Sequence, residues 1–222
     1  KPDRLLWYEN NQPDKALELE KNAYMKFLLG DIVEEVLIML TKLSGHTVEG
    51  EQDTLTIAGI EGHRDVVIDG VTADVKSASP YGFQKFKEGL KPETDGFGYL
   101  TQINSYIEAA KDDPIVTDKN RGAFLALQKV TGAITLDVHE KTLDIEPEYE
   151  RQKEMVKGPM PDKCFEPEPY GKSGNMKLPF NCGYCPFRKE CWPEARTFLY
   201  SNGPVHLTTV AREPKTLEIT DG

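Results

Sequence analysis

The fold is decided by residues 62–76, which read Gly-His-Arg-Asp-Val-Val-Ile-Asp-Gly-Val-Thr-Ala-Asp-Val-Lys. Two β-prone runs flank the Asp-Gly dipeptide, and this pattern is a strong signal for a hairpin with a two-residue turn. Counting outward from the turn predicts that Asp65 lies opposite Asp74 and that His63 lies opposite Lys76. Because strand side chains alternate between faces, these four side chains are expected to share one face.

Two facing carboxylates repel each other at a cross-strand separation of about 5 Å, unless a positive charge lies between them. A divalent metal ion and Lys76 are the candidates for that charge. The alternative is a solvated outer face of a hairpin, on which Lys76 forms a simple ion pair with Asp65 or Asp74. The hairpin alone does not decide between these interpretations.

The composition indicates one globular domain with an appendage, because the chain has 222 residues, of which 38% are hydrophobic. No apolar run approaches the length of a membrane span, and Lys1 does not begin a signal peptide. Because no initiating Met is present, we expect residues to precede Lys1. The net charge of -10 argues against a protein that coats nucleic acid through bulk charge. A local basic track remains compatible with it, since residues 151–191 hold eight Lys and Arg against five Asp and Glu.

The periodicity predicts helices and strands in alternation, which implies an α/β fold with a mixed β-sheet flanked by helices. The first helix is expected to run from Asp14 to about Ser44, and its candidate ligands are Asp31, Glu34 and Glu35. Gly30 lies one turn before Glu34 and allows a backbone or a phosphate to approach that face. The later predicted elements are a strand at 54–60, the hairpin at 65–74, helices at 79–89 and 98–111, a hairpin at 121–139 and a helix at 146–157.

Four motifs follow one another along this pattern: Gly30-x3-Glu34, Gly62-x2-Asp65, Asp74-Val75-Lys76 and Gln102-x3-Tyr106. In this order and spacing the chain resembles the RecB-like branch of the PD-(D/E)XK nuclease superfamily. The resemblance covers residues 30–106. It implies a restriction-endonuclease-like core and a metal-dependent DNA nuclease.

The resemblance assigns a role to each matching residue. Glu34, Asp65 and Asp74, together with the backbone carbonyl of Val75, would hold Mg²⁺ or Mn²⁺, and Lys76 would be the catalytic lysine. The commonest RecB-like form has His at the position of Glu34, whereas related phage-type exonucleases have Glu there. The resemblance further implies that Gln102 and Tyr106 support the site and contact DNA, and we expect His63 to line it.

A second group of residues follows the hairpin and could bind single-stranded DNA. It combines aromatic with basic side chains, namely Tyr81, Phe83, Phe86, Lys85 and Lys87. Aromatic rings beside cations are typical of single-strand binding, and core packing is an equally good interpretation of the rings.

The four cysteines lie in the last third of the chain, at Cys164, Cys182, Cys185 and Cys191. Two disulfides, a structural Zn²⁺ and a [4Fe-4S] cluster are the interpretations, and the absence of a secretion signal disfavours disulfides. The spacing of the last three resembles iron-sulfur RecB-like nucleases, including CRISPR-associated exonucleases and the nuclease domains of break-repair helicases. In those families the fourth cysteine lies far upstream, so Cys164 must replace it here unless one precedes Lys1. We favour [4Fe-4S] over Zn²⁺.

These patterns predict a nuclease core at 1–157, a four-cysteine metal segment packed on it at 158–200, and a C-terminal tail at 201–222. The expected function is an exonuclease that hydrolyses DNA ends or single strands in recombination, repair or phage DNA processing. We expect it in the cytoplasm of a prokaryotic or phage-infected cell, with a homo-oligomer or a helicase as a compatible partner and no membrane contact. A structure-selective endonuclease and a catalytically silent DNA-binding subunit are the alternatives.

Overall fold

The computed structural model describes residues 1–19 and 21–219. The chain divides into two compact units. The terminal unit combines the first 19 residues with the described residues from Gln152 onward, and the central unit holds the chain between them. No helix in the described ranges is long and apolar enough to cross a membrane.

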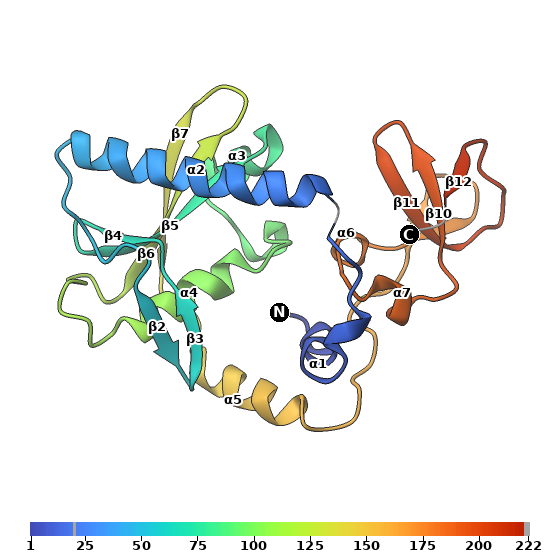
Figure 1. The fold of residues 1–222 in the computed structure, drawn as a ribbon, viewed down its shortest axis with the longest axis horizontal. Helices are drawn as coiled ribbons and strands as arrows, with labels where there is room; N and C mark the ends of the chain where they lie inside the picture. The colour runs from blue at the N-terminus through green and yellow to red at the C-terminus, as the bar shows by residue number, and fades with distance from the viewer. Residues whose placement is uncertain (20, 220–222) are drawn as a thin grey trace. The chain divides into compact units, whose positions relative to one another are not determined.

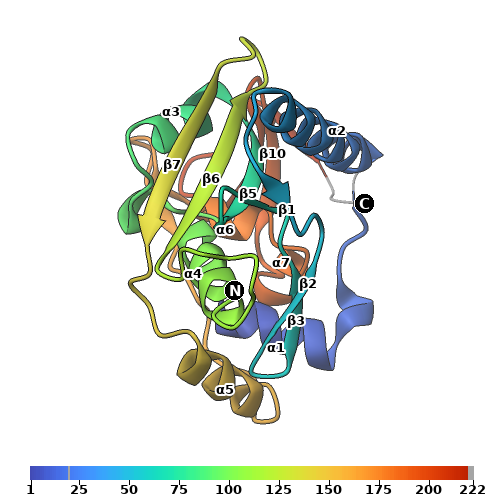
Figure 2. The ribbon, with the colours of Figure 1, turned by 90° about the vertical axis from the view of Figure 1, so that its left-hand side faces the viewer.

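The central unit is built on a five-stranded sheet in the order β1-β4-β5-β6-β7. Strands β5 and β6 are parallel, and the other neighbours are antiparallel, which confirms the predicted mixed sheet. Figure 2 shows β5, β6 and β7 side by side. The strands are β1 (Val48–Glu49), β4 (Val66–Ile68), β5 (Val71–Ala78), β6 (Arg121–Gln128) and β7 (Ile134–Glu140).

Helices cover both faces of this sheet (Figure 1). Helix α2 (Lys21–Leu43) packs Val33, Leu37 and Ile38 onto one face. The opposite face is covered by α3 (Pro80–Lys87) and α4 (Tyr99–Ala109), which follow each other in the crossover from β5 to β6, with η2 (Pro92–Thr94) between them. The sheet therefore lies between two helical layers, as an α/β fold requires.

Helix α2 begins later than predicted. Pro13–Lys15 form the short 3-10 helix η1, and α2 begins at Lys21. The N–H of Leu17 donates to the carbonyl of Pro186 at 2.8 Å, so it cannot continue a helix from Pro13. The predicted end is confirmed, since α2 ends at Leu43, just before Gly45.

The predicted Asp-Gly turn is confirmed. Asp69 and Gly70 have φ values of 50° and 78°, the left-handed pair of a type I′ turn, and Ile68 pairs with Val71. A side chain at Gly70 would collide with Thr117. The turn therefore sets the register that positions the strands on either side of it.

The predicted pairing of His63 with Lys76 is wrong. His63 ends β3 (Ile60–His63), which forms a separate hairpin with β2 (Thr54–Ile57), and it pairs with Thr54. The backbone N–H of Arg64 donates to Asp53, which draws the chain away from the β4–β5 ladder. The predicted single strand at 54–60 is thus two strands.

The hairpin at 121–139 is confirmed by β6 and β7, and the last predicted helix by α5 (Glu146–Met155).

The terminal unit contains an antiparallel five-stranded sheet in the order β12-β10-β11-β9-β8. Its elements are α1 (Asp3–Asn11), β8 (Glu168–Tyr170), β9 (Asn175–Lys177), α6 (Phe180–Gly183), α7 (Arg188–Cys191), β10 (Arg196–Tyr200), β11 (Gly203–Thr209) and β12 (Leu217–Ile219). The predicted tail at 201–222 is therefore wrong, because β11 and β12 lie in it and Leu207 is buried.

The first helix also belongs to the terminal unit, so residues 1–157 do not form a single core. In α1, the ring of Tyr8 stacks on that of Phe187 with centroids 5.0 Å apart, and Arg4 donates to the carbonyl of Pro161 at 2.8 Å. These contacts join the two ends of the chain within one unit.

Candidate functional site

Asp74 and Lys76 lie two residues apart on the central strand β5, so their side chains share a face. Asp74 is only 1% exposed, and its Oδ2 forms an ion pair with the ammonium of Lys76. In the parallel register these residues pair with Phe124 and Ala126, which belong to the core under α3 and α4. Burying the charge of Asp74 beside the half-buried Lys76 is costly, because both groups lose part of their hydration.

Asp65 lies just before β4 and reaches the edge of β5 with its side chain. The ladder between β4 and β5 ends at the pair Val66–Ala73, and Asp65 Oδ2 accepts the N–H of Val75 at 2.6 Å. The N–H and C=O groups of one strand residue point to the same side, so the carbonyl of Val75 faces the same edge. Burial raises the pKa of Asp65.

Glu34 completes a group of three carboxylates. It is half-buried on α2, where its Oε1 accepts a hydrogen bond from the amide of Gln52, while Asp31 and Glu35 are exposed. Burial, followed by the charge of Asp65, raises the pKa of Glu34. Of the three acids that the sequence offered on this helix, Glu34 is thus the one whose charge is coupled to the hairpin.

The charges of this group act on one another. Burial, and then the charge of Asp65, raise the pKa of Asp74 to about 6 although Lys76 opposes the shift. Burial would lower the pKa of Lys76, but the carboxylate of Asp74 outweighs it and the pKa is raised. Asp65, Asp74 and Lys76 are therefore coupled in charge, and a cation would favour the ionised form of the two carboxylates.

Helix α4 contributes three side chains from one face, at spacings of three and four residues. Gln102 donates to the hydroxyl of Tyr106 at 3.3 Å, and burial together with the field of Asp74 raises the pKa of Tyr106. The ring of Tyr106 lies against Gly62, where an added Cβ would be 3.4 Å from it. Tyr99 was missed by sequence reasoning, although it lies one turn before Gln102, and its ring centroid is 5.0 Å from the ammonium of Lys76.

Two other groups of predicted residues are placed differently. His63 is exposed, and its Nδ1 lies 3.2 Å from the hydroxyl of Thr54 in the separate β2–β3 hairpin. Phe83 and Phe86 are buried in the core, so the interpretation of these two rings as a DNA track is wrong. Tyr81 is exposed, and the ammonium of Lys85 lies 4.9 Å from its ring centroid.

Gln52 and Arg64 were also missed, and no motif marks Gln52. Arg64 precedes Asp65 and is fully buried, with ion pairs to Asp53 at 2.7 Å and to Asp113 at 2.6 Å. Its guanidinium fixes the segment from which Asp65 projects. In the sequence, Arg64 could have been found because it is a charged residue directly before the candidate ligand Asp65.

The four cysteines gather in the terminal unit as free thiols. Burial, followed by the charges of Cys185 and Cys191, raises the pKa of Cys182 to about 11. Cys164 contributes to the raised pKa values of the other three, so all four thiols lie in one electrostatic neighbourhood. Short turns hold them, with the N–H of Cys185 donating to Cys182 O at 3.2 Å.

Neither group of residues is arranged as a closed metal site. Among the His, Cys, Asp and Glu side chains that the structure describes, no three are placed so that they could hold a metal ion. At the carboxylate group, the ammonium of Lys76 contacts Oδ2 of Asp74. The donor types still match two different metals, since oxygens suit Mg²⁺ and thiolates suit zinc or iron-sulfur clusters.

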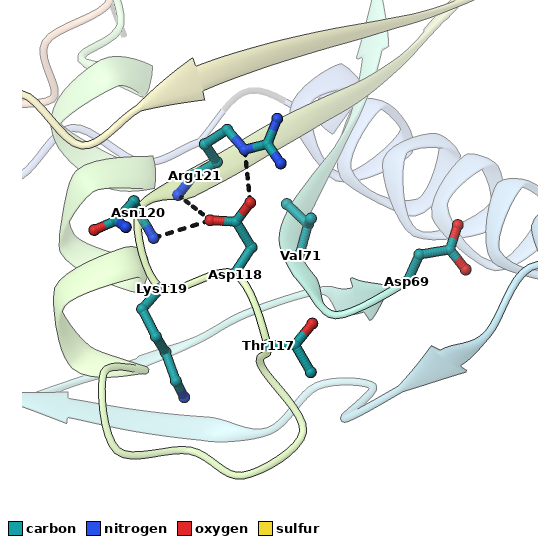
Figure 3. A pocket seen from close by; sticks show the side chains of 7 residues that line it. All are labelled: Asp69, Val71, Thr117, Asp118, Lys119, Asn120 and Arg121. Carbon is teal, nitrogen blue, oxygen red and sulfur yellow. Dashed lines mark hydrogen bonds and ion pairs between the residues drawn. The ribbon is translucent and has the colours of Figure 1, made fainter.

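A separate open pocket of about 440 Å³ lies where β5 and β6 begin (Figure 3). It contains none of the predicted site residues. Asp118 is held there by the N–H groups of Asn120 and Arg121, each at 3.1 Å. The pocket is lined by Asp69, Val71, Thr117, Asp118, Lys119, Asn120 and Arg121.

No protein-family model matches the chain, and no curated protein matches it significantly. Among solved structures, the crystal structure of SSO0001 is similar to it with a TM-score of 0.46 and 17% sequence identity. That similarity covers 83% of this chain and 78% of that chain. A likeness at this level identifies neither a family nor a function.

Proposed function

We propose that the chain is a metal-dependent DNA exonuclease of the RecB-like PD-(D/E)XK type, hydrolysing phosphodiester bonds at DNA ends or in single strands. One observation carries the proposal: the buried Asp74 pairs with the half-buried Lys76 on a central strand, and the charge of Asp65 acts on both Asp74 and Glu34. Perturbed carboxylates beside a half-buried lysine are typical of catalytic sites.

The oxygen donors fit Mg²⁺ or Mn²⁺. Glu34, Asp65, Asp74 and the carbonyl of Val75 would hold the ion, and burial, which raises the pKa of each of the three acids, makes their negative charge costly without a cation. Bound there, the ion would polarise the phosphate and lower the pKa of a water ligand.

The chain's own residues supply the rest of the chemistry. Lys76 keeps its proton, since its pKa is raised, so its ammonium can stabilise the negative charge that develops on the phosphate oxygens. Tyr99 holds that ammonium through its ring, and Gln102 with Tyr106 forms a polar wall on the α4 side. Asp65 fixes the strand edge beside Asp74 through the N–H of Val75.

The test is digestion of end-labelled linear DNA with Mg²⁺ or Mn²⁺. We expect Lys76→Met and Asp74→Asn to reduce cleavage by at least a hundredfold, because each removes a charge needed in the transition state. Lys111→Met is the matched control, since Lys111 is exposed just after α4 in an ion pair with Glu108. Full cleavage by both site variants would reject the proposal.

The substrate shape separates the alternatives. An exonuclease degrades a linear molecule and spares a closed circle, whereas a structure-selective endonuclease cuts a circle that carries a loop or a flap. A catalytically silent subunit would bind DNA without cleaving either. We place the activity in recombination, repair or phage DNA processing in the cytoplasm, where DNA ends are the substrate.

For the terminal unit we propose that Cys164, Cys182, Cys185 and Cys191 hold a [4Fe-4S] cluster with a structural role. Their shared electrostatic neighbourhood supports a four-thiolate site, and structural Zn²⁺ is the alternative. Protein purified without oxygen should show a broad absorbance band at about 400 nm. A colourless protein with one equivalent of zinc would favour the alternative.

A further inference from the structure

The loop before α4 holds two aromatic residues in a fixed geometry. The carboxylate of Asp95 accepts the N–H groups of Phe97 at 3.3 Å, Tyr99 at 3.0 Å and Leu100 at 2.8 Å. Lys85 on α3 donates to the carbonyl of Thr94 at 2.7 Å and so ties the loop to the neighbouring helix. The backbone that carries the rings is therefore organised by the protein itself, which reduces the entropy cost of using them for binding.

The two rings lie in a row from the half-buried Lys76 to the surface. The centroid of Tyr99 lies 5.0 Å from the ammonium of Lys76, and its ring also contacts Phe86 and Phe124 in the core. The ring of Phe97 stacks on Tyr99 with centroids 5.4 Å apart and planes at 30°. Phe97 is 63% exposed, which is a large fraction for a phenylalanine.

We propose, resting on the nuclease function above, that Phe97 and Tyr99 are a base-stacking platform and that the site takes single-stranded DNA. A base in the interior of a duplex has both faces covered by its neighbours, so away from a duplex end an unpaired base is needed to lie on the ring of Phe97. Stacking accepts every base because each has a π-face, which suits a nuclease without sequence preference. Lys76 lies beyond the ring of Tyr99, so in this arrangement its ammonium would face the phosphate next to the stacked base.

The platform is tested with a single-stranded oligonucleotide and with a duplex of two fully paired strands whose ends are covalently capped, so that neither unpaired bases nor open terminal faces are present. Binding is measured by fluorescence anisotropy without divalent metal, and cleavage is measured with Mg²⁺. Phe97→Ala should weaken single-strand binding and raise KM about tenfold or more, as expected for the loss of one stacked base, with duplex binding unchanged. Phe97→Trp should restore binding, whereas Phe97→Leu should not, because leucine keeps the apolar bulk without the π-face. Tyr24→Ala is the matched control, since Tyr24 is 62% exposed on α2.

The outcomes separate the platform from the nuclease function. If the wild-type protein cleaves DNA and Phe97→Ala binds and cleaves single strands equally well, the platform is rejected and the nuclease function stands. Equal losses on single strands and on the duplex also reject it. If the wild-type protein cleaves nothing, the nuclease function is rejected on its own, and loss of single-strand binding in Phe97→Ala would still support the platform.

A different observation concerns the outer side of α2. Opposite its packed residues, the helix exposes a stripe of apolar side chains with fractional exposures between 39% and 75%. The spacing alternates between four and three residues, which is the heptad pattern of a coiled-coil seam. The stripe consists of Met25, Leu29, Ile32, Val36, Met39 and Leu43, with Leu28 and Leu40 beside it.

This stripe is large for the surface of a monomer. At about half exposure each, the eight side chains present on the order of 700 Å² of apolar area, above the few hundred Å² typical of the largest monomer patches and close to one side of a stable interface. A heptad seam is also its own complement, because the knobs of one copy fit the holes of an identical one. We infer that a second copy of this chain covers the stripe and that α2 packs against α2 in a homodimer.

Sedimentation equilibrium tests the dimer at micromolar concentration. The wild-type protein should be a dimer, and Ile32→Lys should raise its dissociation constant at least tenfold because the lysine would be buried in the seam. Tyr24→Lys is the control, because Tyr24 is also exposed on α2, at 62% against 51% for Ile32, but lies outside the stripe. Circular dichroism verifies that each variant is folded. A monomeric wild-type protein, or a dimer that Ile32→Lys leaves intact, would overturn the inference.

Discussion

The carboxylate of Asp65 accepts the N–H of Val75 at 2.6 Å, at the point where β4 has ceased to pair with β5. One side chain thus replaces a backbone ladder bond and also presents negative charge to Asp74. The two tasks can be separated by substitution, because an amide oxygen accepts a hydrogen bond as a carboxylate does but carries no charge.

We therefore predict that Asp65→Asn keeps the stability of the wild-type protein within about 1 kcal/mol, whereas Asp65→Ala loses about 1–3 kcal/mol through the unpaired N–H. Both should lose metal binding. Urea unfolding and calorimetric Mn²⁺ titration measure the two effects. Equal stability of the two variants would show that the hydrogen bond to Val75 contributes nothing.

The pH dependence of stability follows from Asp74. Its pKa is about 6 in the folded chain, above its ordinary value of 3.8, so the folded state favours the protonated carboxyl. The stabilising contribution is complete below the unfolded pKa and is lost as the pH rises through about 6. Without metal, Asp74→Asn should therefore be more stable than the wild-type protein at about pH 8, by at most about 3 kcal/mol in the free energy of unfolding. At about pH 4 the two proteins should have the same stability. Parallel melting curves across this range would contradict the assignment.

The ring of Tyr99 should matter more than its hydroxyl. Because a cation–π contact contributes about 1 kcal/mol, Tyr99→Leu should lower kcat about fivefold, whereas Tyr99→Phe should keep it. The ring centroid lies 5.0 Å from the ammonium of Lys76. Single-turnover cleavage at saturating DNA separates this effect from binding. An equal loss in both variants would mean that the hydroxyl is the active group.

Arg64 should be a major determinant of stability. Its side chain is 0% exposed and pairs with Asp53 and Asp113, so Arg64→Ala would leave a cavity and the largely buried Asp113 without its partner, and should cost about 3 kcal/mol or more. Arg121→Ala is the control, because Arg121 is more than half exposed in its ion pair with Asp118 and should cost at most about 1 kcal/mol. Chemical denaturation compares the two. Similar losses would refute the structural role of Arg64.

Metal loading of the cysteines should release protons. Burial, followed by the charges of Cys185 and Cys191, raises the pKa of Cys182 to about 11, so its thiol is protonated at neutral pH and must lose that proton to become a ligand. Zinc affinity of the apo protein should therefore rise between about pH 6 and pH 8. Cys182→Ser should reduce the bound metal and lower the melting temperature of the loaded protein. Unchanged metal content in that variant would remove Cys182 from the site.

The parts of the fold that the sequence predicted correctly depend on local signals. The turn at Asp69-Gly70 and the end of α2 before Gly45 are each set by a residue that adopts a left-handed conformation. The start of α2 could not be predicted, because it depends on a hydrogen bond from Leu17 to Pro186, far away in the sequence. Local propensity contains no information about such a contact.

In the candidate site, too, the residues placed by local geometry were predicted correctly, and those placed by distant contacts were not. Asp65, Asp74 and Lys76 could be brought together by counting from the turn, because strand geometry is periodic. His63 was misplaced because the count assumed that the ladder continued past Asp65, whereas the N–H of Arg64 donates to Asp53 instead. Gln52 was missed since its contact with Glu34 joins a loop to a helix.

The terminal unit is assembled from the two ends of the chain, with α1 contributing Tyr8 to the ring of Phe187. During synthesis the central unit leaves the ribosome as a continuous segment and can fold at once, since domains generally fold as units in the order in which they emerge. Helix α1 is made before the central unit but meets its partner only after Phe187 has been made. A chain that stopped at residue 151 would therefore hold the strands of the central sheet together with an α1 that lacks the ring of Phe187, and it would contain none of the four cysteines.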